Sequence, residues 1–133
     1  MGEMITPRQQ TLLHILANLA DDIKTGAVVP GRGFIFRGGE PCDAMGHLIT
    51  KMGDPPSERL SCALLPLLRL SGYPPDAQSH NALLGTQVPE TIRDMMYIND
   101  NLPLDDETRG PSIAAELLKL RDALICFYAE VSV

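Results

Sequence analysis

The apolar residues of the chain recur mainly at the spacing of α-helices. The clearest segment begins at Thr6-Pro7-Arg8-Gln9, which combines an N-cap, a proline at the first helical position and the glutamine of a capping box. Apolar positions then recur every three or four residues and end near Gly26, which predicts one helix with a single buried face. The residues of this face are Leu12, Leu13, Ile15, Leu16, Leu19 and Ile23.

Prolines and glycines divide the rest of the chain into shorter helical segments. We predict a helix over residues 41–53 that begins at its proline, and a brief helix over 76–84. Pro66 should kink or split the apolar stretch 60–70, because it removes a backbone donor. Another helix begins at Pro89. The chain is therefore predicted to be mainly α, an irregular bundle of five or six helices in one domain over residues 1–133.

A long helix is predicted from Pro111 onwards, after a polar loop from Asn99 to Gly110. Its core stripe is sustained at helical spacing. The stripe consists of Ile113, Leu117, Leu120, Leu124 and Phe127.

Residues 27–39 interrupt the helical pattern with two β-prone runs around Pro-Gly-Arg-Gly. They predict a small β-hairpin near residues 27–37, in which Phe34 and Phe36 must pack on helices because an isolated ribbon is marginal in water. The alternative is an anion-binding glycine loop assisted by Arg32 or Arg37, although the segment lacks the Lys-Ser/Thr of a phosphate-binding loop. The sequence leaves both interpretations open.

Composition narrows the class of protein. The 133 residues include 44% hydrophobic and 21% charged residues, which is typical of one globular domain. A net charge of -6 disfavours nucleic-acid binding. The start of the chain lacks a signal-peptide pattern, no apolar run is long enough to span a membrane, and the three cysteines have no CxxC spacing. We therefore expect reduced thiols and a cytoplasmic location.

Two short segments resemble an uncharacterised family of small bacterial and phage helical proteins. They are Gly-Glu-Pro-Cys-Asp-Ala-Met-Gly-His-Leu at residues 39–48, and Ile98-Asn99-Asp100 followed by a closing helix with Glu116-Leu117-Leu118. Ile98 stands where the family has a tryptophan, and the middle of the chain does not match. The resemblance implies a stand-alone helical domain, a mobile-element origin and a pairing of the Cys42 helix start with the Asn99-Asp100 loop. It implies no activity.

Cys42 is the residue that invites a catalytic hypothesis. A thiol in the first turn of a helix is favoured as a nucleophile by the helix dipole. His80 follows in the chain and Asn99 or Asp100 comes later, which is the order of nucleophile, base and orienting residue in papain-like cysteine hydrolases. In those enzymes the base lies on a strand, whereas His80 falls in a helix-prone segment. A small cysteine hydrolase is therefore the alternative hypothesis, and the favoured one is not an enzyme.

Metal and cofactor sites have no supporting spacing in the sequence. Potential ligands occur, but not at the spacing of a zinc or EF-hand site. We expect neither a metal nor a cofactor. The potential zinc ligands are Cys42, Asp43, His47, Cys62 and His80, and the potential calcium ligands are Asp100, Asp105, Asp106 and Glu107.

The remaining hypothesis is a non-enzymatic protein-binding module, for instance an accessory protein of a phage or mobile element. The partner and the oligomeric state are not predicted by the sequence. The loop before the last helix supplies the candidate contacts, because it combines acidic side chains with two apolar residues that no periodicity assigns to the core. These partner-binding candidates are Leu102, Leu104, Asp105, Asp106 and Glu107.

Overall fold

A computed structural model of the protein describes residues 5–53, 64–73 and 76–131. Within these ranges the chain forms the predicted mainly helical bundle with a small antiparallel hairpin. The helices and strands are α1 (Pro7–Thr25), β1 (Phe36–Arg37), β2 (Glu40–Pro41), α2 (Ala44–Lys51), α3 (Leu64–Leu70), α4 (Ala77–Leu84), α5 (Val88–Asn101) and α6 (Arg109–Val131). Predictions that concern residues 54–63, Cys62 included, lie outside the described residues.

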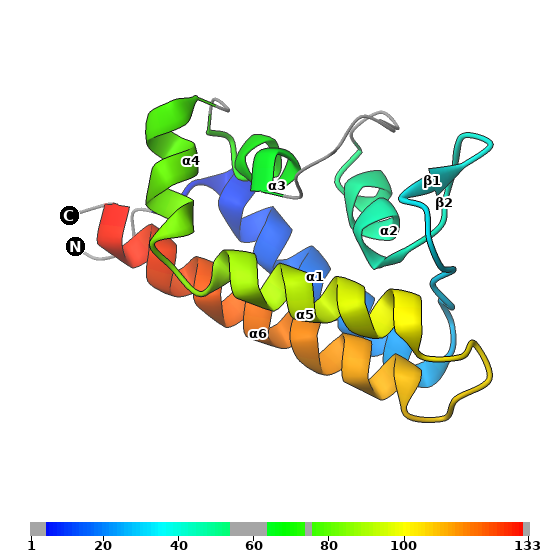
Figure 1. The fold of residues 1–133 in the computed structure, drawn as a ribbon. Helices are drawn as coiled ribbons and strands as arrows, with labels where there is room; N and C mark the ends of the chain where they lie inside the picture. The colour runs from blue at the N-terminus through cyan, green and yellow to red at the C-terminus, as the bar shows by residue number, and fades with distance from the viewer. Residues whose placement is uncertain (1–4, 54–63, 74–75, 132–133) are drawn as a thin grey trace.

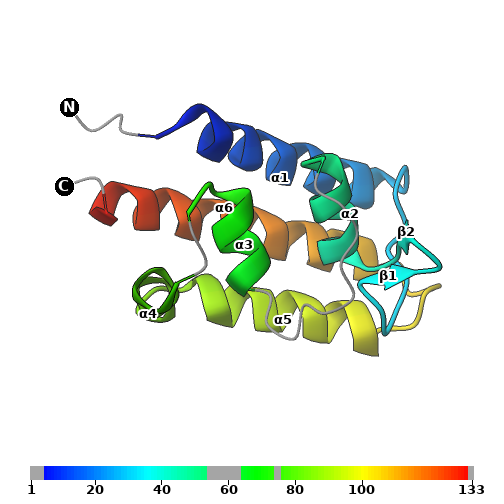
Figure 2. The same cartoon turned by 90° about the horizontal axis from the view of Figure 1, so that it is seen from above.

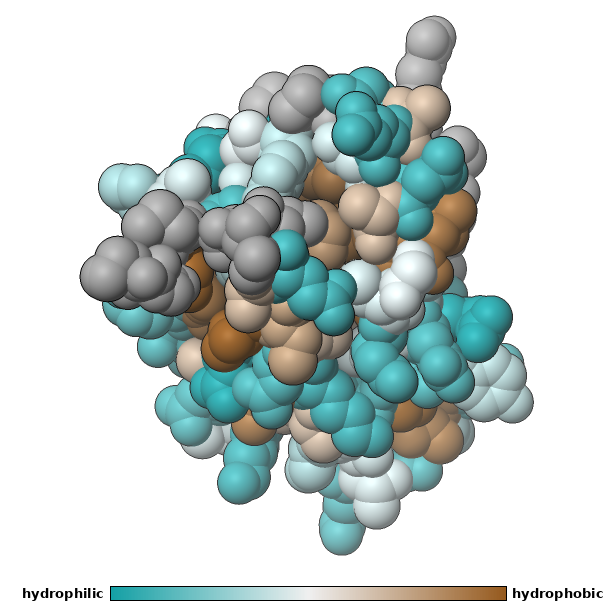
Figure 3. Space-filling view, turned by 90° about the vertical axis from the view of Figure 1, so that its left-hand side faces the viewer, coloured by the Kyte–Doolittle hydropathy of each residue, from teal (hydrophilic) through white to brown (hydrophobic). Residues whose placement is uncertain are grey.

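Three long helices form one layer of the bundle. In Figures 1 and 2, α6 runs between α1 and α5, and the shorter helices α2, α3 and α4 lie on one side of this layer. Seen from the end at which α4 lies, the surface is mostly hydrophilic with small apolar patches (Figure 3). None of the helices in the described ranges is both long and apolar enough to cross a bilayer.

The first helix begins where its sequence predicts. The Gln9 amide donates to Thr6 Oγ1 at 3.1 Å, and the Thr6 amide donates to Gln9 Oε1 at 2.9 Å, which completes a capping box. The helix ends at Gly26 with φ of 85°, a left-handed conformation that glycine adopts without strain. Its predicted apolar face is buried, apart from a half-buried Ile15.

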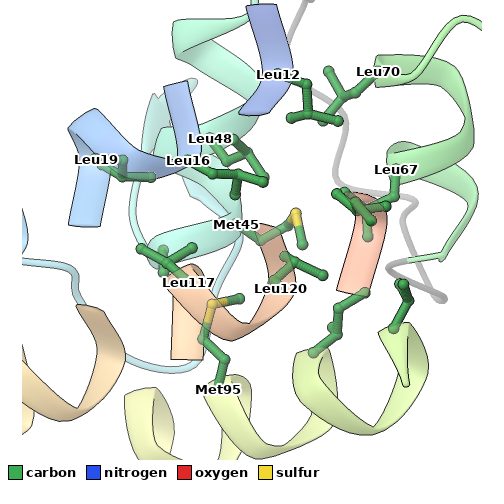
Figure 4. Close-up of a cluster of buried hydrophobic side chains, with 14 of the residues drawn as sticks. Leu12, Leu16, Leu19, Met45, Leu48, Leu67, Leu70, Met95, Leu117 and Leu120 are labelled. Carbon is green, nitrogen blue, oxygen red and sulfur yellow. The ribbon is translucent and has the colours of Figure 1, made fainter. Parts of the chain in front are cut away.

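The core lies between the layer of long helices and the shorter helices. Figure 4 shows leucine and methionine side chains from α1, α2, α3, α5 and α6 that converge there. All five residues of the predicted stripe on α6 are buried, as predicted. They are Ile113, Leu117, Leu120, Leu124 and Phe127.

The hairpin spans residues 36–41 and therefore lies further along the chain than the predicted 27–37. Its strands pair Phe36 with Pro41 and Arg37 with Glu40, around a turn of two glycines, Gly38 and Gly39, with φ of 61° and 83°. Such a turn matches the twist of a hairpin, and only glycine adopts both angles readily. The Pro-Gly-Arg-Gly segment is not this turn, because its amides at positions 31 and 33 bond to more distant parts of the chain.

Two predictions about the hairpin's surroundings are wrong. Phe36 is buried, but Phe34 is 57% exposed instead of packing on a helix. The Cζ atom of Arg37 lies over the Phe34 ring, 5.9 Å from the ring centroid. The second helix does not begin at Pro41, which belongs to β2. It begins at Ala44 because Asp43 provides the N-cap.

The polar loop predicted from Asn99 to Gly110 is shorter in the structure, because α5 and α6 both extend into it. Helix α5 continues to Asn101 and α6 already begins at Arg109, so the loop consists of residues 102–108 only. Asn99 is a buried residue of α5, not a residue of the loop. Pro111 lies within the first turn of α6.

Candidate functional site

The strongest concentration of buried polar groups lies where the loop after α1 meets α2, α5 and α6. We call it the polar junction, and it consists of Asp43, Asn99, Asp100 and Arg109. Asp43, Asn99 and Arg109 are each at most 2% exposed. Buried polar groups on this scale require partners, so their hydrogen bonds determine what the junction does.

Arg109 connects three segments through backbone carbonyl groups. Its guanidinium donates to the carbonyl oxygens of Pro30 at 2.7 Å, Gly31 at 3.2 Å and Asn99 at 2.6 Å. Burial lowers the pKa of Arg109, although an arginine remains charged at neutral pH. The side chain therefore fixes the loop after α1 to the end of α5.

Asn99 makes the second connection in the polar junction. Its Nδ2 donates to the Gly31 carbonyl at 2.8 Å and to Asp100 Oδ1 at 3.0 Å, and its Oδ1 accepts from the Ala44 amide at 3.3 Å. The end of α5 is thereby joined to the start of α2. The contact implied by the family resemblance is present, while the resemblance itself stays a prediction.

Arg32 and the nearby glycine amides are engaged in internal bonds. Arg32 donates twice to the Asp100 carbonyl, at 3.0 and 2.9 Å, and the Gly33 amide donates to Asp100 Oδ1 at 3.0 Å. The Gly31 amide donates to the carbonyl of Cys42. These groups bind the chain itself, so they do not form a cradle for an anion in this conformation.

The residues of the hydrolase hypothesis do not come together. Cys42 is half-buried, precedes the N-cap of α2 and lies against Gly31, where an added Cβ would be 2.6 Å from its sulfur. His80 lies on α4, and both views place α4 at the opposite end of the bundle from β2 and α2 (Figures 1 and 2). Only Asn99 and Asp100 lie near Cys42, so the thiol lacks the predicted base.

The potential metal ligands were predicted from Cys42, Asp43, His47, Cys62 and His80, and from the acidic residues of the loop before α6. Among the described residues, no group of three or more histidine, cysteine or acidic side chains could hold a metal ion. Asp43 instead accepts the Gly46 amide at 2.8 Å and caps α2. Cys62 lies outside the described residues.

The predicted contact residues of the loop between α5 and α6 differ in their exposure and in their internal bonds. Asp106 has a structural role, because its Oδ1 accepts from the amide and the hydroxyl of Thr108, at 2.8 and 2.6 Å, and these bonds lower the pKa of Asp106. Leu102 is half-buried. Asp105 and Glu107 are exposed, and Leu104 is 56% exposed. Leu104 and the two exposed acids are therefore free to meet a partner.

A hollow of about 230 Å³ lies beside this loop, where the end of α1 meets the start of α6. Leu104 and Val29, of which Val29 is 64% exposed, both line it. Lys24, Glu107 and Pro111 also line the hollow. Val29 is not among the predicted contact residues, because its only signal in the sequence is that it directly precedes a proline outside any helical period.

Asp43 is the titratable group of the polar junction whose pKa is most displaced. Burial, assisted by the negative charge of Asp100, raises the pKa of Asp43 from 3.8 to about 6. The folded state thus binds this proton more tightly than the unfolded state does, so the protein gains stability as the pH falls from about 7 towards 4. That stability is lost again as the pH rises through 6. The rise of the Asp43 pKa from 3.8 to about 6 corresponds to about 3 kcal/mol of stability at most.

We expect Asp43→Asn to remove this pH dependence, because asparagine also caps helices but carries no charge. In denaturant unfolding, the variant should be at least as stable as the wild type at pH ~7 and lose that advantage at pH ~4. Asp76→Asn is the matched control, since Asp76 also caps a helix but is fully exposed. A stability difference between Asp43→Asn and the wild type that is constant over this pH range would contradict the assignment.

Comparisons with known proteins leave the site without a precedent. The chain matches no protein-family model, no curated protein and no solved structure. No activity or partner can therefore be transferred to it from a relative. Its function has to be inferred from the hollow, the loop and the buried contacts described above.

Proposed function

We propose that the protein is a non-enzymatic module that binds another protein through the hollow between Val29 and Leu104. The observation that carries the proposal is the placement of these two exposed apolar side chains, which come from distant segments, on the same hollow. Exposed apolar residues that gather at one place on the surface mark interaction sites, whereas scattered ones are ordinary. We further propose a cytoplasmic role as an accessory protein of a bacterium or phage, without nucleic-acid binding.

The partner should present an apolar side chain with basic residues around it. The hollow is large enough for a single side chain, and Val29 and Leu104 would bury their apolar surface against it. The exposed carboxylates of Asp105 and Glu107 lie in the adjacent loop and would attract a basic rim. Charges at a rim chiefly accelerate association, so binding should be faster at low salt.

The rigidity of the hollow supports a binding role. Arg109 and Asn99 hold the carbonyls of Pro30 and Gly31, the two residues that follow Val29 in the chain. A wall that is fixed before binding loses little conformational entropy when the partner arrives. The polar junction thus acts in this proposal as a support for the binding surface and not as a catalytic centre.

The test is a quantitative pull-down from the native cell with the double variant Val29→Ser/Leu104→Ser. Both side chains are mostly exposed, so the free energy of unfolding should change by less than about 1 kcal/mol while the specific partner is lost. The matched control is Leu84→Ser/Tyr97→Ser, which removes apolar side chains that are 52% and 68% exposed elsewhere. It should retain the partner.

A second variant examines the acidic rim. Asp105→Asn/Glu107→Gln leaves the structural Asp106 unchanged and should slow association with the captured partner, more at low salt than at high salt. If the Val29/Leu104 variant and its control recover the same proteins in equal amounts, the hollow is not the binding site.

A further inference from the structure

A larger groove lies at the opposite end of the molecule from the Val29–Leu104 hollow. It has a volume of about 560 Å³ and runs between the C-terminal half of α6 and the start of α5, with the corner Gly85–Gln87 at one end. On α6 the groove is lined at intervals of three and four residues, which is one face of a helix. The residues of this face are Lys119, Asp122, Ala123, Cys126, Phe127 and Glu130.

The floor of the groove is apolar and its rim is acidic. Ala123 and Phe127 form the floor and are at most 9% exposed. Glu90 of α5, together with Asp122 and Glu130 of α6, surrounds them with exposed carboxylates. The groove therefore combines a narrow apolar floor with exposed carboxylates from both helices.

The basic residues near the groove do not cancel this charge. Lys119 is engaged with Glu116, with its Nζ 3.0 Å from Glu116 Oε2, and this hydrogen bond raises the pKa of Lys119. Arg121 Nη2 lies 3.3 Å from Asp122 Oδ1 in an exposed ion pair. Such a pair contributes little free energy, so a cation of a partner can replace Arg121 beside Asp122. Within the described ranges, Glu90 has no ion-pair partner.

We propose that this groove binds an amphipathic helix of a partner protein, with basic residues flanking its apolar stripe. From residue 119 to residue 130 the lining face extends about 16 Å, or three turns, at the rise of an α-helix. An amphipathic helix in a groove is a common mode of peptide recognition, and its apolar anchors recur at the same spacing as this lining. A second copy of the chain fits less well, because it carries a net charge of -6 and would repel the acidic rim.

The probe is a synthetic helix of about 14 residues with a leucine stripe, lysine flanks and a single tryptophan. The protein contains no tryptophan, so the fluorescence of the peptide can be excited without a background from the protein. We expect saturable binding that weakens with salt, and no binding of the same peptide with glutamate in place of lysine.

Matched variants separate the groove from general charge attraction. The groove variant is Glu90→Gln/Asp122→Asn/Glu130→Gln, which removes three exposed carboxylates that line the groove. The outside variant is Asp21→Asn/Asp105→Asn/Glu107→Gln, which removes the same charge from exposed positions elsewhere. The groove variant should weaken binding by about tenfold or more, and the outside variant by less than about threefold. Equal losses, or a loss confined to the outside variant, would overturn the proposal.

Steric blocking gives an independent result. Cys126→Arg places a cation in the middle of the groove, whereas Leu118→Arg adds the same charge to another exposed position of α6. Cys126→Arg should abolish binding of the lysine peptide, and Leu118→Arg should preserve it. Circular dichroism should show that both variants are folded. A protein that is dimeric in sedimentation and becomes monomeric with Cys126→Arg would show that a second copy fills the groove, against the proposal.

Discussion

Leu117→Ala and Leu120→Ala should each lower the free energy of unfolding by about 2–5 kcal/mol. Both leucines are fully buried, and Figure 4 shows them among methionines and leucines from α1, α2 and α5. Truncation removes their apolar surface from the core and leaves a cavity that rigid helices on several sides cannot close completely. Denaturant unfolding of each variant measures this loss.

The control is Leu118→Ala in the same helix. Leu118 has the same helix propensity as the two buried leucines, because it is the same residue type. It is 37% exposed and therefore contributes less to the core. Its loss should remain below about 1 kcal/mol. Losses below ~1 kcal/mol for both buried leucines would mean that the stripe on α6 is not the centre of the core.

Arg109→Met should cost about 2–4 kcal/mol, since it leaves the buried carbonyl oxygens of Pro30 and Asn99 without a donor at about 1–3 kcal/mol each and regains only part of the cost of burying a cation. The Gly31 carbonyl loses one of its two donors and keeps the Asn99 amide, so the attachment of the loop after α1 to α5 is weakened but not removed. Arg109→Lys should recover a fraction of the stability, because one ammonium group cannot reach all three oxygens.

Arg93→Met serves as the control for Arg109→Met, because Arg93 is an exposed arginine of α5. Its effect should stay within about 0.5 kcal/mol. If Arg109→Met unfolds at the same denaturant concentration as the wild type, the polar junction does not stabilise the fold and cannot serve as the rigid wall of the Val29–Leu104 hollow.

The features that the sequence predicts correctly depend on residues close together in the chain. The capping box at Thr6 and Gln9 and the helix end at Gly26 each act within one helical turn. The stripe of α6 is equally local, because helical periodicity alone places its residues on one face. These signals were sufficient for a mainly helical bundle with a small hairpin.

The site depends on contacts that no local pattern encodes. Gly31 and Gly33 were predicted to lie in or beside a hairpin turn, yet their amides bond to Cys42 and Asp100, far along the chain. Long-range bonds to Ala44 and Gly31 likewise make Asn99 a buried connector instead of a loop residue.

Sequence alone therefore determined the class of fold and most of the core, because helix caps and apolar periodicity act over a few residues. The tertiary structure decided which side chains share a site. It separated Cys42 from His80, brought Val29 and Leu104 to one hollow, and left one face of α6 open as a groove. The physical reason is that the packing of whole helices fixes distances between residues that the order of the chain does not constrain.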